Sequence, residues 1–140
     1  MAPAGSPPRT PGVAGGDPAE ERGAYEKALD ILKEGRYREA AEAFRAFRDA
    51  YPASRYAANA QYWLGEAFYV TRDFETALQE FQKVLADFPA SGKVADARLK
   101  VGFIQYELKR WAEARKTLES VVAAYPDSTA ARLAANRLER

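Results

Sequence analysis

Apolar residues recur every three or four positions through most of this chain, which is the spacing of helices that each bury one face. Six stretches follow the pattern and a seventh comes after them: 19–34, 37–50, 55–71, 74–87, 93–109, 111–124 and about 129–138. Breaks of about two polar residues separate the two members of each pair. Such short breaks make the paired helices antiparallel. The pattern predicts an all-α fold of three helix pairs and one last helix.

The three pairs repeat one another at a fixed interval. An aromatic residue and a proline end each second helix, 37 residues apart: Tyr51-Pro52, Phe88-Pro89 and Tyr125-Pro126. A serine stands two positions after each proline, where it is placed to cap the next helix: Ser54, Ser91 and Ser128. A repeat of 20–50 residues indicates a solenoid, in which each unit covers the apolar face of its neighbour.

The ends of the chain differ from the repeats. Residues 1–18 contain five of the eight prolines and show no apolar periodicity, so they are typical of a flexible linker, with a Pro-rich ligand motif as the alternative. We expect one domain at 19–140, with repeats at about 21–54, 55–91 and 92–128 and a capping helix at 129–139. Arg132, Asn136 and Arg137 of that helix should face solvent.

The second repeat resembles the tetratricopeptide (TPR) signature. The matching residues alternate between small and large side chains across the helix pair: Leu64-Gly65, Phe68, Ala77, Phe81 and Pro89. Small residues at positions 65 and 77 allow the helices to approach closely, while the two phenylalanines fill the neighbouring space. The resemblance implies a right-handed TPR superhelix of three helix-turn-helix repeats with a C-terminal capping helix.

Three further features narrow the resemblance to one TPR family. They are the 37-residue period, the run 58–66 (ANAQYWLGE) behind a Tyr-Pro-Ala-Ser junction, and the lone final helix. Together they resemble the C-terminal domain of the Tol-Pal system proteins of the YbgF/CpoB family. The resemblance implies a periplasmic adaptor that binds TolA, has a peptidoglycan synthase as a possible second partner, and coordinates outer-membrane constriction with septal peptidoglycan synthesis.

The same family carries a signal peptide and a trimerising coiled coil before its TPR domain. We therefore expect this chain to be a piece of a longer exported protein that forms homotrimers through a segment not present here. Two alternatives stay open. The first is the TPR module of an outer-membrane assembly lipoprotein, and the second is a recruitment subunit for a peptidoglycan enzyme.

Composition argues against other classes of function. Lys and Arg number 21 against 20 Asp and Glu, so there is no field of one sign to attract nucleic acid. The absence of Cys and His removes the commonest metal ligands and general bases, and no phosphate-binding loop occurs. No apolar run is long enough to insert into a membrane. We predict a protein that is not an enzyme and has no catalytic residue, metal or cofactor.

Each first helix carries a second apolar stripe in addition to the one that faces its partner helix. In TPR stacks the first helices line a concave groove, so this stripe and its polar neighbours are our candidate partner-binding residues. They are Tyr25, Asn59, Tyr62, Glu66, Tyr69, Asp96, Leu99, Phe103 and Tyr106. The alternative is that these side chains only pack between adjacent repeats. We further expect Tyr62, Tyr69 and Tyr106 to be dispensable for folding.

Two more expectations concern the second helices. Trp111 aligns with Tyr37 and Phe74 and should be a buried wedge between helices. The glutamates of these helices should form a solvated outer face, because they alternate with Lys and Arg at helical spacing: Glu39, Glu42, Glu75, Glu80, Glu113 and Glu119.

Overall fold

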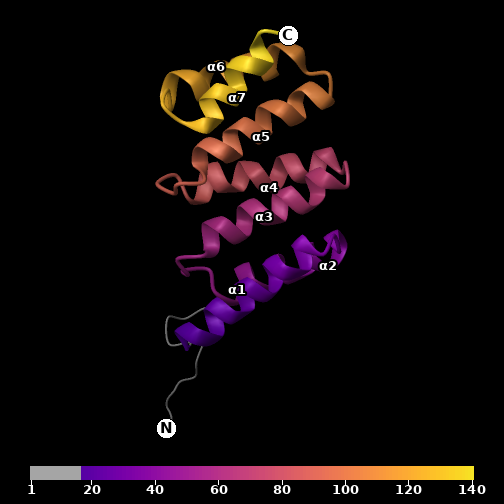
Figure 1. Ribbon diagram of the computed structural model, residues 1–140, viewed down its shortest axis with the longest axis vertical. Coiled ribbons are helices and arrows are strands. Elements are labelled where there is room, and N and C mark those ends of the chain that lie inside the picture. Colours follow the sequence, from indigo (N-terminus) through magenta and orange to yellow (C-terminus); the bar gives the residue numbers. More distant parts are fainter. Residues whose placement is uncertain (1–16) are drawn as a thin grey trace.

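The computed structural model describes residues 17–140, and that part of the chain contains seven helices and no strand. Residues 1–16, most of the predicted linker, lie outside the described residues. The helices are α1 (Pro18–Lys33), α2 (Tyr37–Ala50), α3 (Ala57–Val70), α4 (Phe74–Asp87), α5 (Val94–Glu107), α6 (Trp111–Ala124) and α7 (Thr129–Leu138). Figure 1 shows them stacked in chain order, with α1 at one end and α7 at the other. The predicted all-α repeat architecture is confirmed.

The predicted second helices have the observed bounds, whereas the first helices begin differently. Helix α1 starts at Pro18, and the Asp17 side chain caps it by accepting a hydrogen bond of 2.9 Å from the Ala19 amide. The expected linker boundary at residue 18 is therefore two residues too late, because both positions belong to the helix start. Proline fits the first position of a helix, where no amide partner is needed.

The junctions between repeats use serine in two ways. Ser54 and Ser91 accept hydrogen bonds of 2.9 Å from the amides two residues later, and they fix the turn ahead of α3 and α5. Ser128 accepts from the Ala131 amide at 2.9 Å and is the N-cap of α7. The predicted capping role is therefore confirmed for Ser128, while Ser54 and Ser91 stabilise the turn before the helix.

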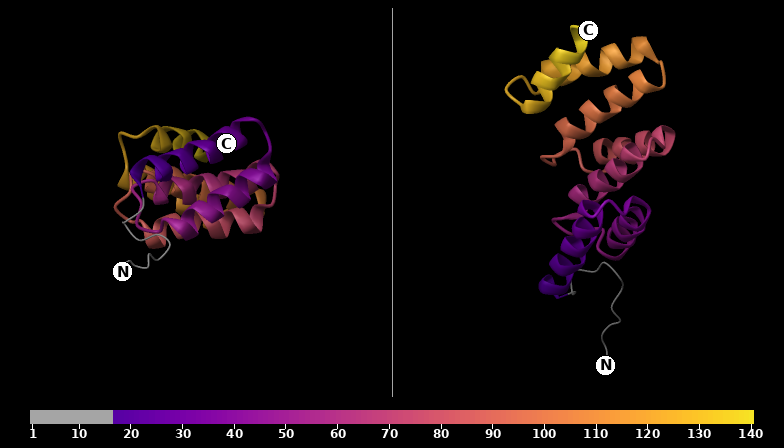
Figure 2. Two further views of the ribbon diagram at one scale, coloured as in Figure 1. Left: turned by 90° about the horizontal axis from the view of Figure 1, so that it is seen from below. Right: turned by 45° about the vertical axis from the view of Figure 1, so that its right-hand side comes forward.

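The hydrophobic core runs along the stack as three successive clusters, each shared by one helix pair and the first helix that follows it. Figure 2 shows the helix pairs of successive repeats stacked over one another. Two close approaches lie inside the repeats: a Cβ built on Gly65 would stand 2.8 Å from the Phe81 ring, and one on Gly102 would stand 2.5 Å from Leu118. Glycine at these positions lets α3 press on α4 and α5 on α6.

A polar cluster connects the first repeat to the second. Gln61 Nε2 donates to the Glu80 backbone oxygen and to Glu80 Oε1, both at 2.8 Å, and Arg48 Nη1 donates to Gln61 Oε1 at 3.1 Å. Only 5% of Glu80 is exposed. The expectation that Glu80 belongs to a solvated face is wrong, because the Gln61 amide turns it inward and Arg48 neutralises its charge. Hereafter we call these three residues the polar cluster.

Trp111 does not have the predicted wedge position. The residue is 57% exposed, and its ring lies against Tyr106, with the ring centroids 5.6 Å apart. As the first residue of α6, Trp111 has one side of its ring exposed to solvent. Its equivalents Tyr37 and Phe74 are half-buried, so the alignment of the three positions is right, but full burial does not follow from it.

We predict that Gly65→Ala destabilises the fold by about 1–2 kcal/mol. The new methyl meets the fully buried Phe81 ring, which has no room to move, and this cost exceeds the roughly 1 kcal/mol that alanine gains over glycine in a helix. Gly23→Ala in α1 is the matched control: no atom lies within 4 Å of its Cβ, so the same change should stabilise. Urea unfolding of both variants measures the difference, and equal signs would contradict the close approach.

We also predict that Glu80→Lys lowers the free energy of unfolding by at least about 3 kcal/mol. The change removes the carboxylate from a buried ion pair and places a second cation beside Arg48. Glu119→Lys on α6 is the control, because that residue is exposed and takes part in no ion pair within residues 17–140. Its effect should stay within about 0.5 kcal/mol. Similar losses in the two variants would contradict the assigned role of the polar cluster.

Candidate functional site

The sequence-predicted site residues lie on α3 and α5, with Tyr25 on α1, and we call the surface they share with α7 the first-helix face. Three of the nine, Tyr25, Tyr62 and Leu99, are at most 7% exposed and belong to the core. The other six are half-buried: Asn59, Glu66, Tyr69, Asp96, Phe103 and Tyr106. The stripe therefore reaches the surface mainly in the second and third repeats.

Tyr25 packs against the second repeat. Its ring stacks on Tyr56 with centroids 4.7 Å apart and planes 14° apart, and Trp63 Nε1 donates a hydrogen bond of 3.0 Å to its hydroxyl. Burial raises the pKa of Tyr25, while the bonds from Trp63 and Asn59 act in the opposite direction. The candidate residue Tyr25 thus packs against the second repeat and does not face a shared opening.

Tyr62 is likewise part of the fold. Its ring meets Phe81 edge-on at 5.3 Å, and Lys93 Nζ lies 4.7 Å from the ring centroid. The pKa of Tyr62 is raised by burial first and then by the carboxylates of Glu66 and Asp96. The expectation that the fold does not need Tyr62 is wrong, because this side chain joins the first and second helices of its repeat.

Glu66 and Tyr69 share one cation from the next repeat. Lys100 Nζ lies 3.1 Å from Glu66 Oε1 and 4.4 Å from the centroid of the Tyr69 ring. Lys100 is 19% exposed and Glu66 24% exposed, so the pair is partly shielded from water. Burial raises the pKa of Tyr69, and Glu107 raises it further. The hydroxyl is therefore a neutral donor and acceptor at physiological pH.

Phe103 and Tyr106 are covered by the capping helix. The Arg137 guanidinium lies 4.2 Å from the Phe103 centroid and 5.5 Å from the Tyr106 centroid. No carboxylate lies within ion-pair distance of Arg137 in the described part of the chain. The expectation that Arg137 faces solvent is wrong in part. The side chain is half-buried, and its guanidinium group packs on the two aromatic rings. Its neighbours Arg132 and Asn136 are exposed as expected.

One position of the 37-residue register supplies the cover in the second repeat, the third repeat and the capping helix, and it is not among the sequence-predicted site residues. Trp63, Lys100 and Arg137 are spaced by 37 residues, and each reaches the stripe of the repeat before it. We call this the cover position. This position can be recognised in the sequence, because the three residues align in the 37-residue register and each side chain carries an N–H group. The three residues differ in class, one being aromatic and two cationic, so the apolar pattern alone does not reveal the position.

The first-helix face is therefore partly a packing surface and partly an open one. Adjacent repeats bury its first-repeat end, as the alternative interpretation held. Its exposed part is an aromatic area with cations resting on it, bordered by Trp111: Tyr69, Phe103, Tyr106, Lys100 and Arg137. Half-exposed aromatic and arginine side chains are the residue types that dominate protein interfaces.

Within residues 17–140, no group of three acidic side chains lies close enough together to hold a metal ion, and no helix has the length and apolarity needed to cross a membrane.

Solved structures with the same architecture include TPR domains. The first TPR of Spaghetti, bound to an HSP90 peptide, superposes with a TM-score of 0.73 at 22% sequence identity. The superposition covers 91% of this chain and 94% of the Spaghetti chain. PcrH from Pseudomonas aeruginosa superposes with a TM-score of 0.76 at 17% sequence identity, and the superposition covers 89% of this chain and 93% of PcrH. At these identities the likeness shows the fold alone, which is a TPR superhelix.

Sequence comparison gives the family. The model described as YfiO, outer membrane lipoprotein, matches residues 18–139. Cell division coordinator CpoB from Pseudomonas putida is 53% identical over 51 residues, which are 36% of this chain and 19% of the relative. The chain thus spans about a fifth of the length of that curated relative. The chain belongs to the YfiO family, and its three repeats with their final helix form a CpoB-like TPR domain.

Proposed function

We propose that this chain is the non-enzymatic partner-binding module of a periplasmic Tol-Pal adaptor that binds TolA. In this role it coordinates outer-membrane constriction with septal peptidoglycan synthesis during cell division. The observation that carries the proposal is the 53% identity to cell division coordinator CpoB over 51 residues. The TPR architecture supports it, because such stacks present a continuous surface to a protein partner.

The binding surface of this proposal is the exposed part of the first-helix face. Tyr69, Phe103 and Tyr106 offer apolar area and hydroxyl groups, and Lys100 and Arg137 stand directly over their rings. A partner segment with apolar side chains gains contact with the rings, and a carboxylate on it gains Arg137, whose charge no described carboxylate neutralises. Asn59 and Asp96 lie nearer the core and have a secondary role.

A second candidate function rests on the family model, which is described as an outer membrane lipoprotein and matches residues 18–139. In this version the chain is the TPR module of an outer-membrane assembly lipoprotein. Both versions use a protein partner and differ in which one. A peptidoglycan synthase as second partner, and trimer formation through a preceding coiled coil, belong to the first version. A recruitment subunit for a peptidoglycan enzyme is a separate alternative.

We predict that Tyr69→Ala and Tyr106→Ala each weaken TolA binding by about 1–3 kcal/mol, the range of interface hot spots. The two side chains are half-buried at the face, so their loss should cost the fold less than that of the fully buried Phe81. Isothermal titration of the purified chain with TolA measures the affinity. Melting temperatures of the same variants exclude unfolding as the cause.

Glu119→Lys on the far helix α6 is the matched control and should bind as the parent does. Folded tyrosine variants that bind TolA like the parent, beside a Glu119→Lys variant that does not, would move the site to the second helices. If the folded parent chain does not bind TolA, the proposal of a Tol-Pal adaptor is contradicted and the alternative of a lipoprotein module is favoured.

A further inference from the structure

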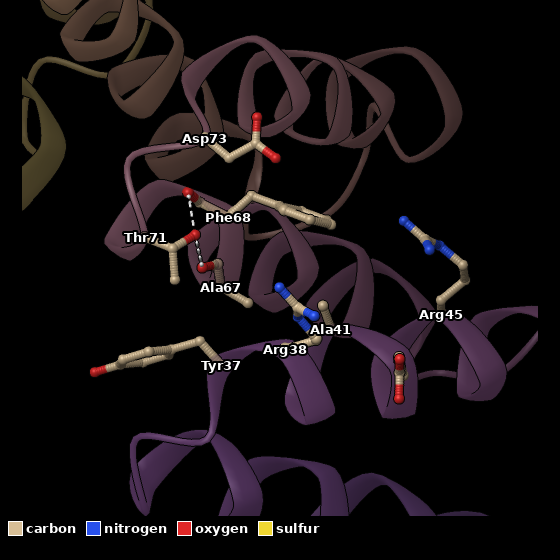
Figure 3. A pocket seen from close by; sticks show the side chains of 9 residues that line it. Tyr37, Arg38, Ala41, Arg45, Ala67, Phe68, Thr71 and Asp73 are labelled. Atoms are coloured by element: carbon tan, nitrogen blue, oxygen red, sulfur yellow. Dashed lines mark hydrogen bonds between the residues drawn. The ribbon is translucent and has the colours of Figure 1, made fainter.

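A separate pocket lies between α2 and α3, and the turn before α4 closes one end of it. Its volume is about 270 Å³, and its apolar lining is formed by Ala41, Ala67 and Phe68. Figure 3 shows the Arg38 and Arg45 side chains rising from α2 beside Phe68, with Asp73 across from them. Ligand pockets for drug-sized molecules measure roughly 300–1,000 Å³, so this one suits a single side chain with its backbone.

The first junction between repeats carries small residues at three positions that line the pocket. A shift of 37 residues places Leu78 at the position of Ala41, Ile104 at that of Ala67 and Leu108 at that of Thr71. Leu78 and Ile104 are buried core residues. The second junction therefore carries larger side chains at three positions whose counterparts in the first junction are an alanine, an alanine and a threonine.

The charges of the two junctions also differ. Arg38 and Arg45 correspond to Glu75 and Gln82, so only the first junction has two guanidinium groups at this place. Arg45 reaches Glu80 at 4.0 Å and stands 5.8 Å from the Phe68 centroid, and Arg38 has no ion pair among residues 17–140. Both arginines thus have donors to offer to a carboxylate.

Two carboxylates also line the pocket, Glu42 and Asp73. Asp73 precedes α4, yet its side chain makes no capping bond to that helix. A ligand with an amide N–H has an acceptor there. The lining therefore offers three distinct interactions: an apolar floor, a pair of guanidinium groups and a carboxylate acceptor.

We propose that this pocket is a second docking site, which takes one apolar side chain of an acidic partner peptide. The side chain lies on Ala41, Ala67 and Phe68, a neighbouring carboxylate is held by Arg38 and Arg45, and a backbone N–H donates to Asp73. The site is separate from the first-helix face and does not depend on TolA being the partner of that face.

The test uses N-acetyl-L-phenylalanine, which combines an aromatic side chain, a carboxylate and an amide N–H. Its uncharged counterpart, N-acetyl-L-phenylalaninamide, serves as the comparison. NMR titration should give saturable shifts of the Ala41 and Ala67 methyl signals, with the acid binding about tenfold more tightly than the amide. Methyl signals of Leu78 and Ile104 in the second junction should not move.

The chain's own second junction supplies the variants. Arg38→Glu combined with Arg45→Gln should weaken binding of the acid about tenfold and leave the amide unchanged. Ala41→Leu should abolish binding of both probes, and Thr71→Leu, at a more exposed position, replaces it if the first variant melts early. Unshifted Ala41 and Ala67 signals in the parent would overturn the proposal. So would undiminished shifts in the folded leucine variant, or acid binding that ignores the loss of both arginines.

Discussion

No repeat of this chain buries its own first helix completely, and the architecture follows from that deficit. Helix α3 has one stripe against α4 and a second that its own repeat covers only in part, with Lys100 of the following repeat lying over Glu66 and Tyr69. The next unit along the chain supplies this cover through the cover position, which recurs every 37 residues as Trp63, Lys100 and Arg137. Since each repeat completes its predecessor, stability propagates along the stack through neighbouring units, and the last one needs α7 as its own cover.

The chemistry of the cover decides what the surface offers to a partner. A large apolar cover, such as Trp63 over Tyr25, closes the stripe, since it bonds to the hydroxyl and leaves Tyr25 only 7% exposed. A cation on a flexible stem covers the ring and keeps its own charge available. The change from tryptophan to lysine to arginine along the chain therefore turns the same position from core into surface. It also places the accessible aromatic area in the second and third repeats.

The sequence predicts well those features that are set by periodicity. The second helices have their expected bounds because an aromatic-proline pair terminates each of them. Exposure is predicted less well, because it depends on what stands opposite. Trp111 looks like a core residue by alignment and Glu80 like a surface residue by charge, and both are the reverse. Neither could be assigned without knowing that Gln61 faces Glu80 and that only Tyr106 faces Trp111 among the aromatic rings.

The polar cluster has a consequence for how such a chain changes over generations. Shifted by 37 residues, Arg48, Gln61 and Glu80 become Leu85, Arg98 and Thr117, so the second junction has neither the carboxylate nor the arginine that faces it in the first. Tandem repeats commonly gain and lose units by duplication, which requires that any unit can follow any other. Here a duplicated or exchanged unit would bring a buried carboxylate against a leucine. The residues at the interfaces thus fix the order of the units, and the repeats of this array are not interchangeable.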